Sequence, residues 1–201
     1  MRDVYDANAT LLEARTRYFE ANAFGPDGGY AETWVDVKVG PIPMRIPNTK
    51  SRVRAIRFHD LHHVLTEYRT NFRGECEIGS WEIGSGCADH WAAWYLNLYA
   101  FATGLLCAPG DVWRAFVRGR HTKNLYRNTF DDALLSRRVG DVRTELALDR
   151  SSPGGGIGDV ITFAMLSLLS VWLLLWAAIF GPFVIGLVWL LVPRARTARP
   201  S

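Results

Sequence analysis

Cysteine is scarce in this chain and provides neither a disulfide framework nor a thiolate metal site. The three cysteines, Cys76, Cys87 and Cys107, are odd in number and show no CxxC spacing. We therefore expect buried free thiols in a reducing compartment. Cys76 could be an occasional metal ligand beside Glu75, although on a helix its side chain points about 100° away.

A strong charge of one sign is also lacking. The net charge of +3 is too small to indicate a nucleic-acid partner, and no nucleic-acid-binding motif is present. The first residues are charged and have no apolar run, so we expect no signal peptide. A length of 201 residues suits one domain with a core plus an appendage.

Histidine is rare but concentrated. Three of the five histidines, His59, His62 and His63, lie next to Asp60, and Glu75 follows twelve residues after His63. On a helix, His59 and His63 share one face with Cβ atoms about 5–6 Å apart, which suits two imidazoles that bind one cation. Five histidines are too few for a membrane di-iron hydroxylase, and a His-Asp phosphohydrolase would need a histidine before His59.

The sequence around these donors predicts two antiparallel helices that bring them together. We expect a helix over 51–68, a turn at Thr70, Asn71 and Gly74, and a second helix that begins close to Glu75. A short loop places the end of one helix beside the start of the next. The predicted ligands of one divalent metal are His59, Asp60, His63 and Glu75. Zn is the first choice, with Fe, Mn or Co as alternatives. A charged, solvated helix with incidental histidines is the competing interpretation.

The second helix carries a periodic stripe. Counted from Glu75 at 100° per residue, Gly79, Glu82, Gly86 and Asp89 or His90 return to nearly one direction. The glycines either allow close helix packing or form the floor of a groove for a flat aromatic ring. In the second case the groove residues are Gly79, Gly86 and Asp89, and the candidates for ligand support or proton transfer are Glu82, His62 and His90.

Several segments, in order, resemble the ubiquinone (coenzyme Q) biosynthesis protein four family. They are His59-Asp60-x-x-His63 with Glu75 after eleven residues, HVLTEYRTNFRGE at 63–75, AFVRGRHTKNLY at 115–126 and TFDDALLSRRVGDVRTELAL at 129–148. The resemblance spans roughly 50–148 and implies an all-α, metal-binding protein on membranes beside other quinone-synthesis enzymes. The activity that it implies is oxidative decarboxylation of a polyprenylated aromatic precursor, in which a hydroxyl replaces the ring carboxyl.

Two regions depart from that family's pattern, the segment 24–49 and the apolar tail after residue 156, which is consistent with a divergent, bacterial-type member. Residues 7–22 predict an amphipathic helix with Asn8 as N-cap, and residues 29–47 then change to a period of two. Val35, Val37 and Val39 alternate with polar residues before Gly40-Pro41, and Ile42, Met44 and Ile46 alternate after it. This pattern predicts a small β-hairpin that covers the core or forms a lid over the metal cleft.

The second departure is an apolar tail. Val160 to Val192 carries no charge and would form a helix of about 50 Å, longer than the roughly 30 Å hydrocarbon core. Arginines flank both ends, which favours a helical hairpin bent at Gly181-Pro182, with both termini cytoplasmic. A single crossing is the alternative. Arg118, Arg120 and Lys123 suit an anionic membrane surface or, equally, a solvated face.

The sequence thus predicts a mainly α protein, a helical bundle with a small N-terminal β-hairpin and a C-terminal membrane hairpin or anchor. The parts are 1–50 (helix and hairpin), 51–150 (metal-binding domain), 151–159 (linker), 160–193 (membrane segment) and 194–201 (basic tail). We expect an oxidative decarboxylase on the cytoplasmic side of a bacterial inner membrane, or alternatively a non-catalytic lipid-binding scaffold. Expected partners are a prenylated aromatic lipid, the membrane, other quinone-biosynthesis enzymes or a second copy, and no nucleic acid.

Overall fold

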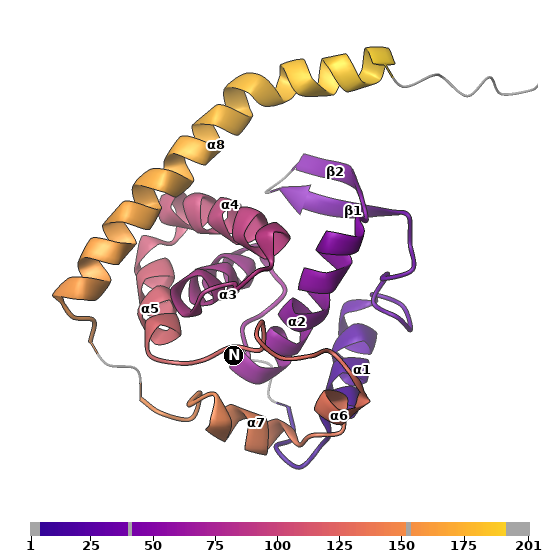
Figure 1. Cartoon of the computed structure of the whole chain (residues 1–201), viewed down its shortest axis with the longest axis vertical. Coiled ribbons are helices and arrows are strands. Elements are labelled where there is room, and N and C mark those ends of the chain that lie inside the picture. The colour runs from indigo at the N-terminus through magenta and orange to yellow at the C-terminus, as the bar shows by residue number, and fades with distance from the viewer. Residues whose placement is uncertain (1–4, 40–41, 152–153, 192–201) are drawn as a thin grey trace, which may run out of the picture.

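The computed structural model describes residues 5–39, 42–151 and 154–191 (Figure 1). Over these ranges the chain is mainly helical, with one two-stranded antiparallel sheet and one long apolar helix at the C-terminal end. The predicted fold class is confirmed to this extent, while the bundle topology stays a prediction.

The first helix, α1 (Leu11–Asn22), begins at a capping box. The Glu13 backbone N–H donates to Thr10 Oγ1 at 3.2 Å, and the Thr10 backbone N–H donates to Glu13 Oε2 at 2.8 Å. The predicted N-cap at Asn8 is therefore wrong. A capping box needs an acidic residue three positions after the cap, and Asn8 has Leu11 at that position.

The predicted β-hairpin is present as β1 (Trp34–Val39) and β2 (Ile42–Pro47), with Val35 opposite Ile46. The expected turn at Gly40-Pro41 lies outside the described residues. The hairpin extends from the N-terminal end of α2, away from the C-terminal half of that helix (Figure 1). Because the predicted metal ligands of α2 lie in its C-terminal half, the hairpin does not form a lid over them.

The helix–turn–helix around the histidines is confirmed. α2 (Lys50–Thr66) is capped by Thr49, and α3 (Phe72–Ser85) begins where the Asn71 side chain accepts the Gly74 backbone N–H at 2.9 Å. The connection is tight, since a Cβ at Gly74 would lie 2.0 Å from the Arg69 carbonyl oxygen. The local capping signals therefore bring the start of α3 back beside the end of α2.

α3 packs against α4 (Trp91–Cys107) and α5 (Pro109–Arg120). The contact with α5 is very close, because a Cβ on Gly84 would lie 2.4 Å from the Phe116 carbonyl oxygen. Likewise, a Cβ on Gly119 would lie 2.2 Å from the Trp81 carbonyl oxygen. Glycine on both helices is what permits this backbone approach.

Two short helices follow, α6 (Asp132–Leu135), which lies beside α1, and α7 (Val139–Glu145), which contacts α2 (Figure 1). The Arg143 guanidinium of α7 donates to the Val64 and Leu65 carbonyl oxygens at 2.9 and 3.0 Å. These carbonyls belong to the last turn of α2, where they lack helical partners. α7 thereby stabilises the helix end that carries the histidines.

The apolar tail forms one continuous helix, α8 (Ile157–Leu191). α8 continues through Gly181-Pro182 and changes direction in its second half without reversing, so the predicted hairpin is not formed (Figure 1). A continuous helix satisfies nearly every backbone polar group of an apolar segment, and Pro182 removes only one donor. α8 starts three residues before Val160 and takes up part of the predicted linker. Within the described chain one stretch, Ile157–Gly181, is long and apolar enough to cross a membrane. The predicted basic tail lies outside the described residues.

Candidate metal centre

Three of the four predicted ligands meet where α2 and α3 adjoin. His59 and His63 come from α2, and Glu75 comes from the first turn of α3. The two Nε2 atoms are 3.2 Å apart, and the Glu75 carboxylate oxygens lie 3.4 Å from His59 Nε2 and 3.3 Å from His63 Nε2. Donors bound tetrahedrally at about 2.0–2.1 Å from zinc lie about 3.3–3.4 Å from one another. The separations, measured to the two different oxygens of Glu75, are of this size, and one donor atom from each residue lies within 4.8 Å of the others.

Hydrogen bonds at the outer ring nitrogens orient both imidazoles. His63 Nδ1–H donates to the Tyr68 carbonyl oxygen at 2.9 Å, and His59 Nδ1–H donates to Glu82 at 3.0 Å. These bonds select the tautomer whose Nε2 is an unprotonated acceptor. Two lone pairs and a carboxylate therefore face one another, an arrangement that requires a proton or a cation between them.

Glu82, which is fully buried, is the centre of this network. Its carboxylate accepts hydrogen bonds from His59, from His62 Nδ1 at 2.6 Å, from the Tyr126 hydroxyl at 2.7 Å and from the Asn97 amide. Burial opposes ionisation, but the charge and hydrogen bonds of His59 and His62 outweigh it and hold the pKa of Glu82 well below its usual value. The anion of Glu82 therefore persists inside the protein.

Two neighbouring carboxylates act on His59 in turn. Burial by itself would lower its pKa, but the carboxylates of Glu82 and Glu75 raise the pKa well above the usual value. With two anions beside it, the His59 ring lies in a site that attracts positive charge. A divalent cation would take the place of the proton.

Asp60, the fourth predicted ligand, is not part of this group. Its carboxylate accepts a hydrogen bond from the Tyr30 hydroxyl at 2.5 Å. The reason is rotational, since adjacent residues on α2 point about 100° apart and Asp60 is directed toward the segment before β1. Burial raises the pKa of Asp60.

The predicted supporting histidines are both buried. The Leu125 backbone N–H donates to His62 Nε2 at 3.0 Å while His62 Nδ1 contacts Glu82, so neither ring nitrogen is available to a metal. His90 Nε2 donates to the Tyr126 carbonyl oxygen at 3.1 Å, and that residue's hydroxyl reaches Glu82. Tyr126 and Asn97 were not predicted as site residues, because nothing in their sequence spacing connects them to Glu82.

The three predicted groove residues do not line a common groove. A Cβ on Gly79 would lie 3.0 Å from Ala100 Cβ, so α4 occupies the space beside it. Gly86 ends α3 with a φ of 84°, and Asp89 is exposed and pairs with Arg54 at 2.8 Å. At Gly79 the structure therefore agrees with the alternative of close helix packing.

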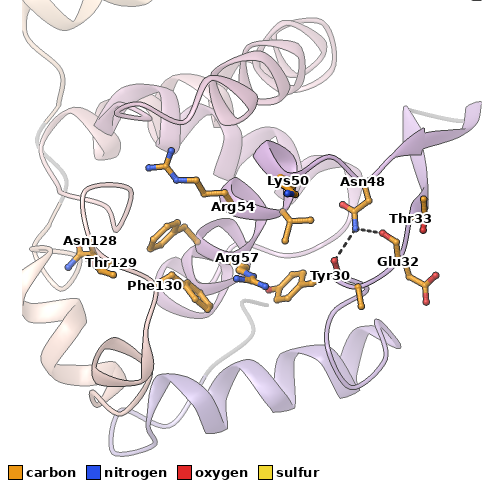
Figure 2. Close-up of a pocket in the computed structure, with 13 residues that line it drawn as sticks. Tyr30, Glu32, Thr33, Asn48, Lys50, Arg54, Arg57, Asn128, Thr129 and Phe130 are labelled. Carbon is orange, nitrogen blue, oxygen red and sulfur yellow. Dashed lines mark hydrogen bonds between the residues drawn. The ribbon is translucent and has the colours of Figure 1, made fainter. Parts of the chain in front are cut away.

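A cavity of about 720 Å³ lies elsewhere on α2 and includes none of the metal donors (Figure 2). Its wall combines Asn48, Arg54 and Arg57 with the rings of Tyr30 and Phe130. The Arg57 guanidinium lies 5.3 Å from the centre of the Tyr30 ring, whose hydroxyl bonds Asp60. Tyr30 thus connects the cavity with the helical turn that carries the histidines.

The predicted membrane-surface residues have different environments. Arg118 is half-buried and donates to the Thr66 carbonyl oxygen at 3.2 Å, with its guanidinium 5.3 Å from the centre of the Tyr68 ring. Arg120 pairs with Asp159 at the start of α8, and Lys123 is exposed. Among the described residues Lys123 makes no side-chain contact of this kind, so it suits an anionic surface and a solvated position equally.

Comparisons with protein-family models, with curated proteins and with solved structures find no match to this chain. The function is therefore argued from the geometry of the site and from the sequence.

Proposed function

We propose that this chain binds one divalent cation through His59, His63 and Glu75 and uses it to act on a membrane lipid. The observation that carries this proposal is the convergence of two Nε2 atoms and a carboxylate at 3.2–3.4 Å from one another. Zn²⁺ suits this nitrogen and oxygen donor set best, with Fe, Mn or Co as the other candidates.

Three protein ligands favour a reactive site over a purely structural one. A structural zinc site has four protein ligands, whereas a catalytic site keeps a position for water or substrate. The Glu75 side chain is 40% exposed and that of His59 is 15% exposed, so the group is accessible from one side. The bound cation would polarise a substrate carboxylate and an adjacent phenolic oxygen. Glu82 would hold the His59 ring in position.

The proposed reaction is oxidative decarboxylation of a polyprenylated aromatic acid. The bond from the ring carbon to its carboxyl group breaks, carbon dioxide leaves, and a hydroxyl from water takes its place. Dioxygen accepts the two electrons and two protons and leaves as hydrogen peroxide. The support is the resemblance over residues 50–148 together with an apolar helix that suits a substrate held in the bilayer.

A lipid-binding scaffold is the second candidate, with the metal in a structural role. It would be favoured by a fourth protein ligand that closes the site, and among the described residues the donor group has three members. The enzyme is therefore the better-supported proposal.

The test is to purify the full chain in detergent, measure its metal content and identify the extracted lipids by mass spectrometry. We expect about one divalent metal per chain and a carboxylated prenyl-phenol. Loss of the metal in His63→Ala, with helicity retained by circular dichroism, would support the ligand assignment. Phospholipid alone would favour the scaffold, and unchanged metal content in His63→Ala would overturn the assignment.

A further inference from the structure

The outer face of α4 exposes large apolar side chains toward both of its ends. No charged residue occurs between Trp91 and Cys107, and side chains on this helix are exposed by 65% at Trp91, 53% at Tyr95 and 75% at Leu106. At 100° per residue these positions fall within about 60° of one another. Leu98 and Ala102 lie on the same face between Tyr95 and Leu106 and are buried. Exposed apolar patches mark a surface that another apolar phase covers.

α8 is docked beside this surface. Phe163 of α8 lies 5.3 Å, between ring centres, from Phe101 of α4 and 5.0 Å from Trp113 of α5. Leu166 and Leu173 also pack against the core. Figure 1 shows the first half of α8 running past α4 and α5 before the second half extends beyond them.

The docked part of α8 lies inside the candidate membrane span. At 1.5 Å per residue, Phe163 and Leu173 are about 9 and 24 Å from Ile157, within a span of about 36 Å. The hydrocarbon core is about 30 Å thick. If α8 is inserted over this stretch, α4 must reach the same depth, so a domain held away from the bilayer on a free tether does not fit.

Charged residues limit how deeply the domain can sink. Asp159, near the start of α8, pairs with Arg120 and His121 at 3.2 and 3.1 Å, and Arg114 of α5 is exposed. Ionic groups are costly in hydrocarbon and stay at the headgroup level. The apolar α4 face can enter the bilayer, while the end of α5 and the start of α8 remain near water.

We propose that the lipid bilayer covers the outer face of α4, so that α4 and the docked half of α8 form one lipid-facing surface. Trp172 and Trp176 of α8 are exposed and extend the same surface along the helix. Tryptophan and tyrosine suit the boundary between headgroups and acyl chains. The inference depends on insertion of α8 and not on the metal chemistry.

This placement brings the metal group close to lipid. Asn97, on the inner side of α4, donates to Glu82, which in turn binds His59. A full helix diameter, about 10–12 Å, and the Glu82 carboxylate beyond it therefore separate the His59 ring from the lipid-facing side of α4.

The experiment measures how strongly a labelled lipid quenches a fluorophore attached to single cysteines in the full chain. Cys107 is the exposed cysteine, whereas Cys76 and Cys87 are buried, so Cys107→Ser provides the background. NBD is attached in Tyr95→Cys and Leu106→Cys on α4, with Leu175→Cys on α8 as reference and Glu20→Cys on α1 as the water-exposed control. The variants are reconstituted in vesicles of phosphatidylcholine and phosphatidylglycerol in equal parts, with and without doxyl-labelled phosphatidylcholine.

We expect doxyl lipid to reduce fluorescence on α4 by a fraction similar to that at position 175, with no loss at position 20. Quenching at position 175 alone would overturn the proposal, because the domain would then lie off the bilayer. A blue shift on α4 without quenching would also overturn it and indicate a second copy or another protein on this face. Quenching at none of the positions would refute insertion of α8, and metal content measured on the same samples would test the metal site separately.

Discussion

At the scale of single residues, the site depends on hydrogen bonds that leave two imidazole lone pairs facing each other. His63 is oriented by a backbone carbonyl and His59 by the buried Glu82 carboxylate. Four donors on Glu82 satisfy an anion whose burial would otherwise be very unfavourable. The ligands and their supporting residues therefore form one network. We expect replacement of a ligand to weaken metal binding more than replacement of a supporting residue.

Glu75→Gln should weaken metal binding by more than about 100-fold, beyond the loss typical of a supporting residue, because the only anionic ligand of the group is neutralised. The matched control is Glu77→Gln, the same change two residues along α3 at a residue outside the donor group. Calorimetric titration of both apo-proteins with Zn²⁺ measures the difference. Equal affinities for the two variants would contradict the assignment of Glu75.

Glu82→Gln should weaken metal binding by about 10–100-fold, because His59 loses the carboxylate that orients it. The new amide NH₂ would also have to face at least one of the four donors, which should lower the free energy of unfolding by about 1–3 kcal/mol. Glu20→Gln, at an exposed position on α1, is the control. Full metal affinity in a folded Glu82→Gln variant would show that Glu82 does not position His59.

At the scale of elements, local signals in the sequence predict some arrangements of helices, while others depend on tertiary contacts. The α2–α3 turn could be predicted because Asn71 and Gly74 act within four residues of each other. The stripe on α3 could not be resolved in the same way. Whether Gly79 faces an open groove or a neighbouring helix depends on α4, which the local pattern does not place.

The α3–α5 crossing provides a test at this scale. Gly119→Ala would bring a Cβ to 2.2 Å from the Trp81 carbonyl oxygen, so the helices must move apart. We expect the free energy of unfolding to fall by about 1–3 kcal/mol, as in other overpacked cores. Gly110→Ala, also on α5, meets only the flexible end of Arg114 at 3.4 Å and should change little. Chemical denaturation in detergent compares the two, and equal stabilities would show that the crossing can relax.

At the scale of the whole molecule, α8 is fastened to the domain and is not simply appended to it. Phe163 inserts among Phe101, Trp113 and Phe116, with ring centres 5.0–5.3 Å away. Asp159 adds ion pairs at the start of the helix. α8 and the rest of the domain therefore should not move independently.

Phe163→Ala should detach the first half of α8 from the domain. We expect the free energy of unfolding to decrease by about 2 kcal/mol, less than the roughly 3–5 kcal/mol of a fully buried phenylalanine, because Phe163 is only half-buried. Phe183→Ala, at a position 75% exposed on the same helix, is the control. Thermal unfolding of the full chain in detergent measures both, and an equal effect of the two changes would contradict docking of α8.

From local signals alone the sequence predicts the histidine-bearing helix and its turn, the alternating hairpin and the long apolar helix. It also identified His59, His63 and Glu75, because helical spacing and a short loop suffice to bring them together. Tertiary structure alone decided that Asp60 faces Tyr30, that Asn97 and Tyr126 reach Glu82, and that α4 fills the expected groove. Each of these contacts joins segments far apart in the chain, so their partners depend on how whole helices pack and not on the spacing of residues along any one of them.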